Sequence, residues 1–244
     1  MQRFSCLICA FLALVAVPVA AQDYVVVEEE WSEAVSASRY VSPQHAAAES
    51  AAIAAFGPFR VLDETTVAIV DVTDSQAPAH FRALMAQFPQ IERLEFVEAP
   101  GTHDDIANLE LGRMIRTSGI ATVAPAGGSI RSGAVELFLA GTERHIDGAS
   151  EFAVHGWLDD RGMGAEDYAA NAPEHRRYLD YYTEMGMQAE QARAFYDMTN
   201  SVPFESALWL TGEEMQDWIG AATPAANAVS QPAAPNIAYS DFAI

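Results

Sequence analysis

The sequence predicts an α/β protein in which helices cover a β-sheet, and three observations support this class. The run Val67–Val72 is almost continuously apolar, as expected for a strand buried on both faces. From Thr66 onward, strand-like apolar runs alternate with segments of helical periodicity. The chain of 244 residues is also long enough to bury a sizeable core in one domain.

The alternation defines the expected elements one after another. The strand at Val67–Val72 is followed by a helix at Ala79–Phe88, which ends before Pro89, and by a strand at Ile91–Val97. The next expected elements are a helix at His103–Thr117, a strand at Ile120–Ala124, a buried helix at Arg131–Ala140 and a strand at Glu151–Val154.

The segments on either side of this alternation are predicted in the same way. Before it we expect short strands at Tyr24–Val27 and Phe59–Leu62, and an alanine-rich helix at Pro43–Phe56. After it we expect helices at Pro173–Met185 and Gln188–Thr199, and a third helix that begins with the capping-box pattern Thr211–Glu214.

The N-terminus has the features of a secretory signal peptide. Arg3 is followed by the apolar run Cys6–Val17, which is short for a membrane span, and then by small residues up to Ala21. We therefore expect cleavage after Ala21 and a periplasmic or secreted bacterial protein without a stable membrane anchor; a retained anchor is the alternative. The expected organisation is a signal peptide at 1–21, an N-terminal segment at 22–65, a folded domain at 66–220 and a flexible tail at 221–244.

Composition excludes several classes of function. The formal charge of −21 argues against binding to nucleic acid or anionic membranes. The sequence contains no lysine, which removes Ser–Lys dyads, Schiff-base chemistry and P-loops. Both cysteines, Cys6 and Cys9, lie in the signal segment, so the mature chain has no disulfide and no thiolate metal site.

The histidines do not predict a metal centre. No pair of the six has the spacing of a helical zinc site. The sequence His103-Asp104-Asp105 is explained more simply as the polar first turn of a helix, with a metal contact as the alternative. We expect neither a metal nor a cofactor.

Ser132 and His155 are the candidate catalytic pair. Ser132 follows a glycine-rich turn and begins a predicted helix, where free N–H groups and the helix dipole favour a developing negative oxygen. His155 ends a predicted strand and could accept the hydroxyl proton. Alone, each has a structural explanation, Ser132 as a helix N-cap and His155 as a hydrogen-bonded strand-end histidine. Gly133 leaves room for a substrate to approach its N–H.

The residues around this pair resemble a known family. The motifs Ser132-Gly133-Ala134, Phe138–Gly141, Arg144, Gly148-Ala149 and Phe152–His155 resemble the catalytic block of the Clp peptidase/crotonase superfamily, and most closely its exported bacterial members. The resemblance extends over about Val67–Gly220. It implies a spiral of strand–strand–helix units with a helical C-terminal elaboration, and identifies 66–220 as a ClpP/crotonase-like domain.

The resemblance implies a role for each matching residue. Ser132 would be the nucleophile, His155 the base, and the N–H groups of Gly101 and Gly133 the oxyanion hole. The sequence departs from the family at Thr102, where a second glycine is usual, and at the third catalytic position.

The third catalytic position has several candidates. A gapless count places Ala207 there instead of an acid, so Glu205 is the tentative orienting acid. Asp197, or no acid at all, is the alternative.

Two functions follow as hypotheses. The first is an exported serine hydrolase, a peptidase that acts on peptide or protein substrates through an acyl-enzyme, and resemblance adds a possible homo-oligomer. The alternative is a catalytically inactive Clp-like envelope binding or scaffold protein. Crotonase-type chemistry on acyl-CoA is disfavoured by the signal peptide and the retained Ser/His pair.

Two further residues have open roles. Arg144 either steers an acidic substrate or supports the helix-to-strand loop, and we favour support. Trp157 is expected to line a cleft beside His155, whereas the other aromatic residues near the C-terminal helices are expected in the core.

Overall fold

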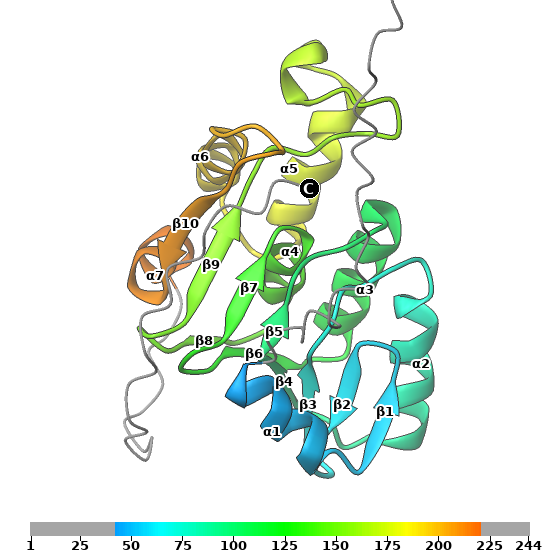
Figure 1. Cartoon of the computed structure of the whole chain (residues 1–244). Coiled ribbons are helices and arrows are strands. Elements are labelled where there is room, and N and C mark those ends of the chain that lie inside the picture. Colours follow the sequence, from blue (N-terminus) through cyan, green and yellow to red (C-terminus); the bar gives the residue numbers. More distant parts are fainter. Residues whose placement is uncertain (1–41, 221–244) are drawn as a thin grey trace, which may run out of the picture. The chain divides into compact units, whose positions relative to one another are not determined.

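A computed structural model describes residues 42–220 of the chain, which form two β-sheets and their covering helices (Figure 1). The expected signal peptide, the strand at Tyr24–Val27 and the expected tail lie outside the described residues. Within the described part, no helix combines the length and apolar character needed to cross a membrane.

The first sheet has six strands in the order β1-β2-β3-β4-β6-β8. β1 to β3 pair antiparallel, and β3, β4, β6 and β8 run parallel. These strands are β1 (Ala54–Phe56), β2 (Phe59–Val61), β3 (Thr66–Ile69), β4 (Arg93–Phe96), β6 (Ala121–Ala124) and β8 (Arg144–Ile146). The sheet therefore begins before residue 66, whereas the sequence predicts a folded domain that starts at residue 66.

The second sheet has four strands in the order β10-β9-β7-β5. They are β5 (Glu98–Ala99), β7 (Ser129–Arg131), β9 (Glu151–Val154) and β10 (Leu208–Thr211). β5, β7 and β9 are parallel, and β10 is antiparallel to β9. An isolated parallel bridge between Thr73 and Thr102 lies just beyond β5.

The two sheets are built from repeated units, which confirms the predicted fold class. One unit is β4, β5 and α3 (Asp105–Thr117), and the next is β6, β7 and α4 (Gly133–Leu139). β8 and β9 repeat the strand pair. Each unit gives one strand to each sheet, and this repetition places Ser132 and His155 just after the neighbouring strands β7 and β9.

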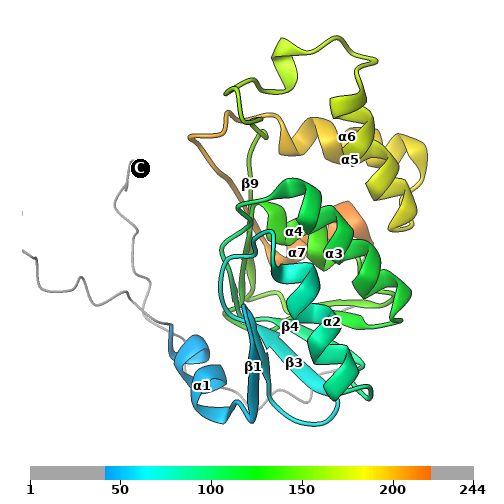
Figure 2. The same cartoon turned by 90° about the vertical axis from the view of Figure 1, so that its right-hand side faces the viewer.

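Helices cover both faces of the first sheet. α2 (Ala77–Gln87), α3 and α4 lie side by side on one face (Figure 2). On the other face, α1 (Pro43–Ala51) packs its buried Ala48 against Ala68 and Val70. Alternate residues Val67 and Ile69 belong to the main core, as the two-residue period of a strand requires.

The C-terminal elaboration adds three α-helices to the repeated units. These are α5 (Pro173–Glu184), α6 (Ala189–Thr199) and α7 (Gly212–Ile219), preceded by a 3-10 turn at Ala165–Asp167. The predicted capping box of α7 is confirmed: Thr211 Oγ1 accepts from Glu214 N at 3.2 Å, and Thr211 N donates to Glu214 Oε2 at 2.7 Å.

The core fixes α4 in position. Its residues from Ala134 to Leu139 are all buried. Phe138 meets Phe96 of β4 and Phe152 of β9 edge to face, with ring centroids 5.5 and 5.3 Å apart. Aromatic pairs of this kind add to the burial energy of a core. The helix that begins at the candidate nucleophile is therefore anchored against both sheets.

Some element bounds differ from those expected. The helix at Pro43–Phe56 ends at Ala51 because Ala54–Phe56 pairs with β2. The helix expected from Arg131 begins at Gly133, because Ser129–Arg131 is a strand paired with β5 and β9. The short strands of the second sheet have too few residues to show a periodicity, and β5, β7 and β10 were not predicted.

Candidate active site

Ser132 adopts a strained backbone conformation at the start of α4. Its φ is 49° and its ψ is −133°. Between residues 42 and 220, Ser132 is the one non-glycine residue with a positive φ. Such a conformation costs about 1–3 kcal/mol and persists where the surroundings impose it. Here Ser132 N donates to Ala153 O at 2.8 Å, and Ser132 O accepts from Val135 N at 2.9 Å.

The Ser132 hydroxyl does not cap its helix. The side chain makes no capping hydrogen bond to α4. The structural explanation of this serine as an N-cap therefore fails. The strain is not offset by a cap, which leaves the hydroxyl free for another role.

His155 follows β9 and is oriented by the main chain. Its Nδ1 lies 2.9 Å from Gly156 O, and because a carbonyl only accepts, Nδ1 carries the proton in this contact. In the neutral ring, Nε2 is then the acceptor. Phe204 lies edge to face with the imidazole, with centroids 4.8 Å apart.

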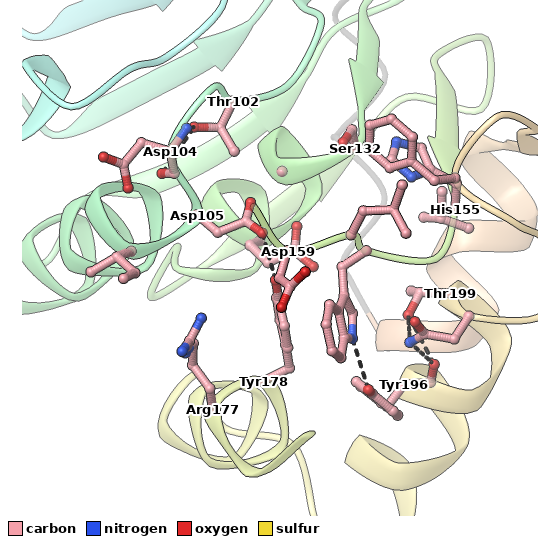
Figure 3. Close-up of a pocket in the computed structure, with 18 of the residues that line it drawn as sticks. Thr102, Asp104, Asp105, Ser132, His155, Asp159, Arg177, Tyr178, Tyr196 and Thr199 are labelled. Carbon is pink, nitrogen blue, oxygen red and sulfur yellow. Dashed lines mark hydrogen bonds between the residues drawn. The ribbon is translucent and has the colours of Figure 1, made fainter. Parts of the chain in front are cut away.

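Ser132 and His155 line the same pocket, which has a volume of about 630 Å³. Figure 3 shows the two side chains together on one side of the pocket, with Thr102, Asp104 and Asp105 facing it from another side and α5 and α6 across from them. No hydrogen bond joins the hydroxyl to the imidazole among the described residues. Catalytic hydrogen bonds often tighten only when substrate binds.

Two glycine amides flank the serine. Gly101 has a φ of 130°, and a Cβ there would lie 3.0 Å from Ser132 Cβ and 3.4 Å from its Oγ. Gly133 is the first residue of α4, so its N–H has no partner within the helix. Within residues 42–220, neither amide donates to a loop carbonyl or a side chain. Both are therefore free to donate to a negative oxygen next to Ser132.

A buried network connects the segments that carry these two amides. Thr73 N donates to Gly101 O at 3.0 Å, and Thr73 Oγ1 donates to Asn108 Oδ1 at 2.9 Å. Asn108 Nδ2 donates to Gly133 O at 2.6 Å. Thr73 and Asn108 are 1% and 2% exposed, so these bonds are shielded from water. Sequence analysis missed both residues, whose only signal is a polar type within an otherwise apolar pattern.

Thr102 and Gly133 are sterically complementary. A Cβ on Gly133 would lie 2.5 Å from Thr102 Cγ2. Thr102 is itself held by its hydroxyl, which donates to Thr73 O at 3.3 Å and to Asp104 O at 3.2 Å. The threonine that replaces the usual glycine thus occupies the space that a side chain at position 133 would need.

The candidate acids do not contact His155 in this structure. Glu205 is exposed in the loop between α6 and β10, and Ala207 is exposed in the same loop. Asp197 lies on α6, where its carboxylate pairs with Arg193 at 3.7 Å. The Gly156 carbonyl is instead the hydrogen-bond partner of His155 Nδ1. Gly156 N in turn donates to Val202 O at 2.8 Å. A carbonyl sets the tautomer but brings no full negative charge to the imidazolium.

Two residues with open roles are now assigned. Arg144 Nη1 donates to Leu139 O at 3.4 Å, so the favoured loop-support role is confirmed, and burial lowers the pKa of its guanidinium. Trp157 lines the pocket as expected, with its Nε1 donating to Tyr196 OH at 2.8 Å. Its ring stacks on Tyr178, with centroids 5.9 Å apart.

The pocket is strongly acidic. Five carboxylates line it, and Arg177 is the one lysine or arginine among its lining residues; the acids are Asp104, Asp105, Glu136, Asp159 and Asp160. Glu136 is 8% exposed, and burial raises its pKa to about 7. Tyr182 OH donates to Glu136 Oε1 at 2.8 Å, and Tyr178 OH donates to Asp105 Oδ2 at 2.7 Å.

No cluster in the described part of the chain is arranged for a metal, since no three His, Cys, Asp or Glu side chains there could hold an ion together. His103 is exposed at the pocket. Asp104 caps α3 by accepting from Ala107 N at 3.0 Å. This contact agrees with the simpler explanation of His103-Asp104-Asp105 as a polar helix start.

Comparisons with known proteins gave structural likenesses only. No family model matches the chain, and no curated protein sequence matches it. A mutant of the 1510-N membrane-bound stomatin-specific protease is similar at 16% identity and a TM-score of 0.45, over 65% of this chain and 77% of that chain. A ClpP1 mutant from Listeria monocytogenes is similar at 15% identity and a TM-score of 0.46, over 66% and 91% of the two chains. A second 1510-N mutant, in complex with a substrate peptide, has 16% identity and a TM-score of 0.41, over 64% and 74%.

Proposed function

We propose that this chain is a serine hydrolase that cleaves peptide bonds, with Ser132 as nucleophile and His155 as general base. The observation that carries the proposal is the conformation of Ser132, which is held at φ 49° with its hydroxyl free of any capping bond. The same residue lines a pocket with His155, and the amides of the neighbouring Gly101 and Gly133 donate to no loop carbonyl within the described residues. Strained serines without a structural role are typical of activated nucleophiles.

The reaction would proceed in two balanced halves. Ser132 Oγ attacks the scissile carbonyl carbon while its proton passes to His155 Nε2, and the oxyanion accepts hydrogen bonds from the amides of Gly101 and Gly133. The C–N bond then breaks, and the leaving amine takes the proton from Nε2. A water molecule gives a proton to Nε2 and attacks the acyl ester. The proton returns to Oγ as the acid product leaves.

The Gly156 carbonyl would replace the usual acid as the orienting group for His155. Its contact with Nδ1 holds the proton on that nitrogen and leaves Nε2 free to act as the base. The imidazolium gains less stabilisation than beside a carboxylate, so we expect a slower enzyme than one with a complete triad. Glu205 remains a candidate only if the loop that carries it moves toward His155.

A fluorophosphonate probe tests the proposal. Wild type should form one covalent adduct on Ser132, detected by intact mass and peptide mapping, and Ser132→Ala should form none. Ser118→Ala, at the C-cap of α3, is the matched control and should label like wild type. Equal labelling of wild type and Ser132→Ala would overturn the assignment.

The alternative is a catalytically inactive binding protein with the same fold. It is favoured by the absence, within the described residues, of a carboxylate on His155 and of a hydrogen bond between that ring and Ser132. A folded wild-type protein that binds peptides but never reacts with the probe would establish it.

Export and oligomerisation also stay proposals. Fractionation of cells that express the full chain should place a product cleaved after Ala21 outside the cytoplasm. Light scattering should give a mass above that of the monomer if the chain assembles as Clp relatives do.

A further inference from the structure

The interior of the pocket contains a carboxylate for which the proposed reaction has no use. Glu136 belongs to the first turns of α4, four residues after Ser132, and both residues line the pocket. One helical turn separates them by roughly 6 Å along the axis. The buried acid therefore shares the pocket with the candidate nucleophile, about one helical turn further along the chain.

We propose that Glu136 binds a cationic side chain, lysine or arginine, at the substrate residue that precedes the scissile bond. This inference rests on the proposed hydrolase function and names its substrate class. Glu136 is more than nine-tenths buried yet lines the pocket, and Tyr182 OH occupies its Oε1. The Glu136 backbone N–H also donates to the carboxyl, and Tyr182 is the one described side chain that hydrogen-bonds to it.

The charge of the surrounding pocket supports the same ligand. Asp105 faces the cavity from α3, and Asp159 and Asp160 line it from the loop after β9. Arg177, the one arginine that lines the pocket, is exposed and makes no ion pair with the described acids. A cleft of one sign concentrates substrates of the opposite sign and repels acidic ones.

The geometry also explains why a cation is the better match than an apolar group. An apolar side chain would remove the remaining solvent from Glu136 without providing a donor, which is costly for a buried polar group. A lysine ammonium or one guanidinium N–H would instead donate to the carboxylate, whose oxygens can each accept more than one hydrogen bond. A charge-assisted bond of this kind is worth more than a neutral one.

The test compares peptides that differ only before the scissile bond, with lysine, norleucine or glutamate at that position. Wild type should cleave the lysine peptide with a kcat/KM more than about tenfold above that of the norleucine peptide. The glutamate peptide should be the poorest substrate. Glu136→Gln should lose the preference for lysine over norleucine. Glu110→Gln makes the same chemical change at an exposed position on α3 and should keep it.

A measurement of peptide binding to a variant without the Ser132 hydroxyl tests this inference independently of catalysis. The full chain carrying Ser132→Ala should bind the lysine peptide about tenfold or more tightly than the norleucine peptide in calorimetry. Addition of Glu136→Gln should abolish the difference. If the probe labels Ser132 but norleucine is preferred, the cation subsite is wrong and the hydrolase stands. If the probe never reacts but lysine is preferred in binding, the hydrolase is wrong and the subsite stands.

Discussion

Ser132 and His155 are held in opposite ways. The serine lies at the start of a helix whose residues from Ala134 to Leu139 are all buried, and the carbonyls of Gly101 and Gly133 beside it are held by Thr73 and Asn108. The histidine depends on one main-chain carbonyl and on Phe204, whose side chain is 49% exposed. The proposed nucleophile and oxyanion donors are therefore preorganised, whereas the proposed base is free to adjust when substrate arrives.

The largest effect on activity should come from a substitution at Gly133, the residue that follows Ser132. Gly133→Ala places a methyl group 2.5 Å from Thr102 Cγ2, so the start of α4 or the segment that carries Thr102 must shift. We expect kcat to fall by about a hundredfold or more, as when an oxyanion donor is lost. Steady-state kinetics on a peptide substrate measures this.

The double variant Thr102→Gly with Gly133→Ala is the control for that result. It removes the contacts with the Thr102 side chain, leaving Asn108 Nδ2 nearest to the added Cβ at 3.2 Å, and should recover part of the lost activity. No recovery would show that the loss in Gly133→Ala does not arise from the contact with Thr102, which would contradict this steric explanation.

Glu136, on the same helix as Ser132, should cause the next effect, a pH dependence of the unfolding free energy. Burial raises the pKa of Glu136 from 4.5 to about 7, with Asp105 of α3 adding to the rise and the Tyr182 hydroxyl of α5 opposing it. Tyr178 and Tyr181 of α5 also interact electrostatically with Glu136, and burial raises their own pKa values far above neutral pH.

The sign follows from linkage, because the unfolded chain releases this proton at lower pH than the folded protein does. The stabilising effect of the protonated group is complete below pH 4.5 and is lost as pH rises to about 7, by roughly 3 kcal/mol. Urea unfolding of wild type and Glu136→Gln should therefore diverge over this range, with the variant relatively more stable at higher pH. Parallel curves would contradict the buried position of the carboxyl.

Asn108→Ala should have a smaller but distinct effect. It leaves the Gly133 carbonyl without its buried partner, while Thr73 Oγ1 keeps its contact with Gly101 O at 3.2 Å, and the loss costs about 1–3 kcal/mol of unfolding free energy. We expect kcat to fall with little change in KM, because the amides are displaced rather than the pocket. Asn108→Asp, which keeps one acceptor, should still lose the bond to Gly133; a normal kcat in both variants would remove Asn108 from a positioning role.

The smallest effect on stability is expected from a substitution at Phe204, which contacts His155. Phe204→Ala removes a half-exposed ring and should change unfolding free energy by less than about 0.5 kcal/mol. Because the ring touches His155, kcat should still change by a few-fold in a peptide assay. If Phe204→Ala destabilises the protein as much as Asn108→Ala does, then the surroundings of His155 are as rigid as those of Ser132, and the contrast between the two residues is wrong.

Sequence patterns predicted the parts of the fold with long periodic segments. The helices at α2, α3, α5 and α6 and the parallel strands β3, β4 and β6 were found because their apolar residues repeat over several turns or over a buried run. β5, β7 and β10 contain two to four residues each, and their pairing depends on contacts distant in the chain. Such strands leave no local signal.

The candidate site follows from the sequence only where its residues lie in a contiguous motif. Ser132, Gly133 and His155 come from one block, and the structure places Ser132 and His155 on one pocket. The orienting group was sought among acids, whereas the contact at Nδ1 is the carbonyl of Gly156, which any residue can supply. Asn108 and Glu136 were missed because their roles depend on burial against other helices, which residue type alone does not reveal.

A crystal structure of the protein after reaction with a fluorophosphonate would test the central claim most directly. We predict a phosphorus–oxygen bond to Ser132 Oγ, with the phosphoryl oxygen about 2.7–3.1 Å from the amides of Gly101 and Gly133. His155 Nε2 should lie within hydrogen-bond distance of the adduct, with Nδ1 still on the Gly156 carbonyl. An unmodified Ser132, or an adduct whose phosphoryl oxygen points away from both amides, would contradict the account.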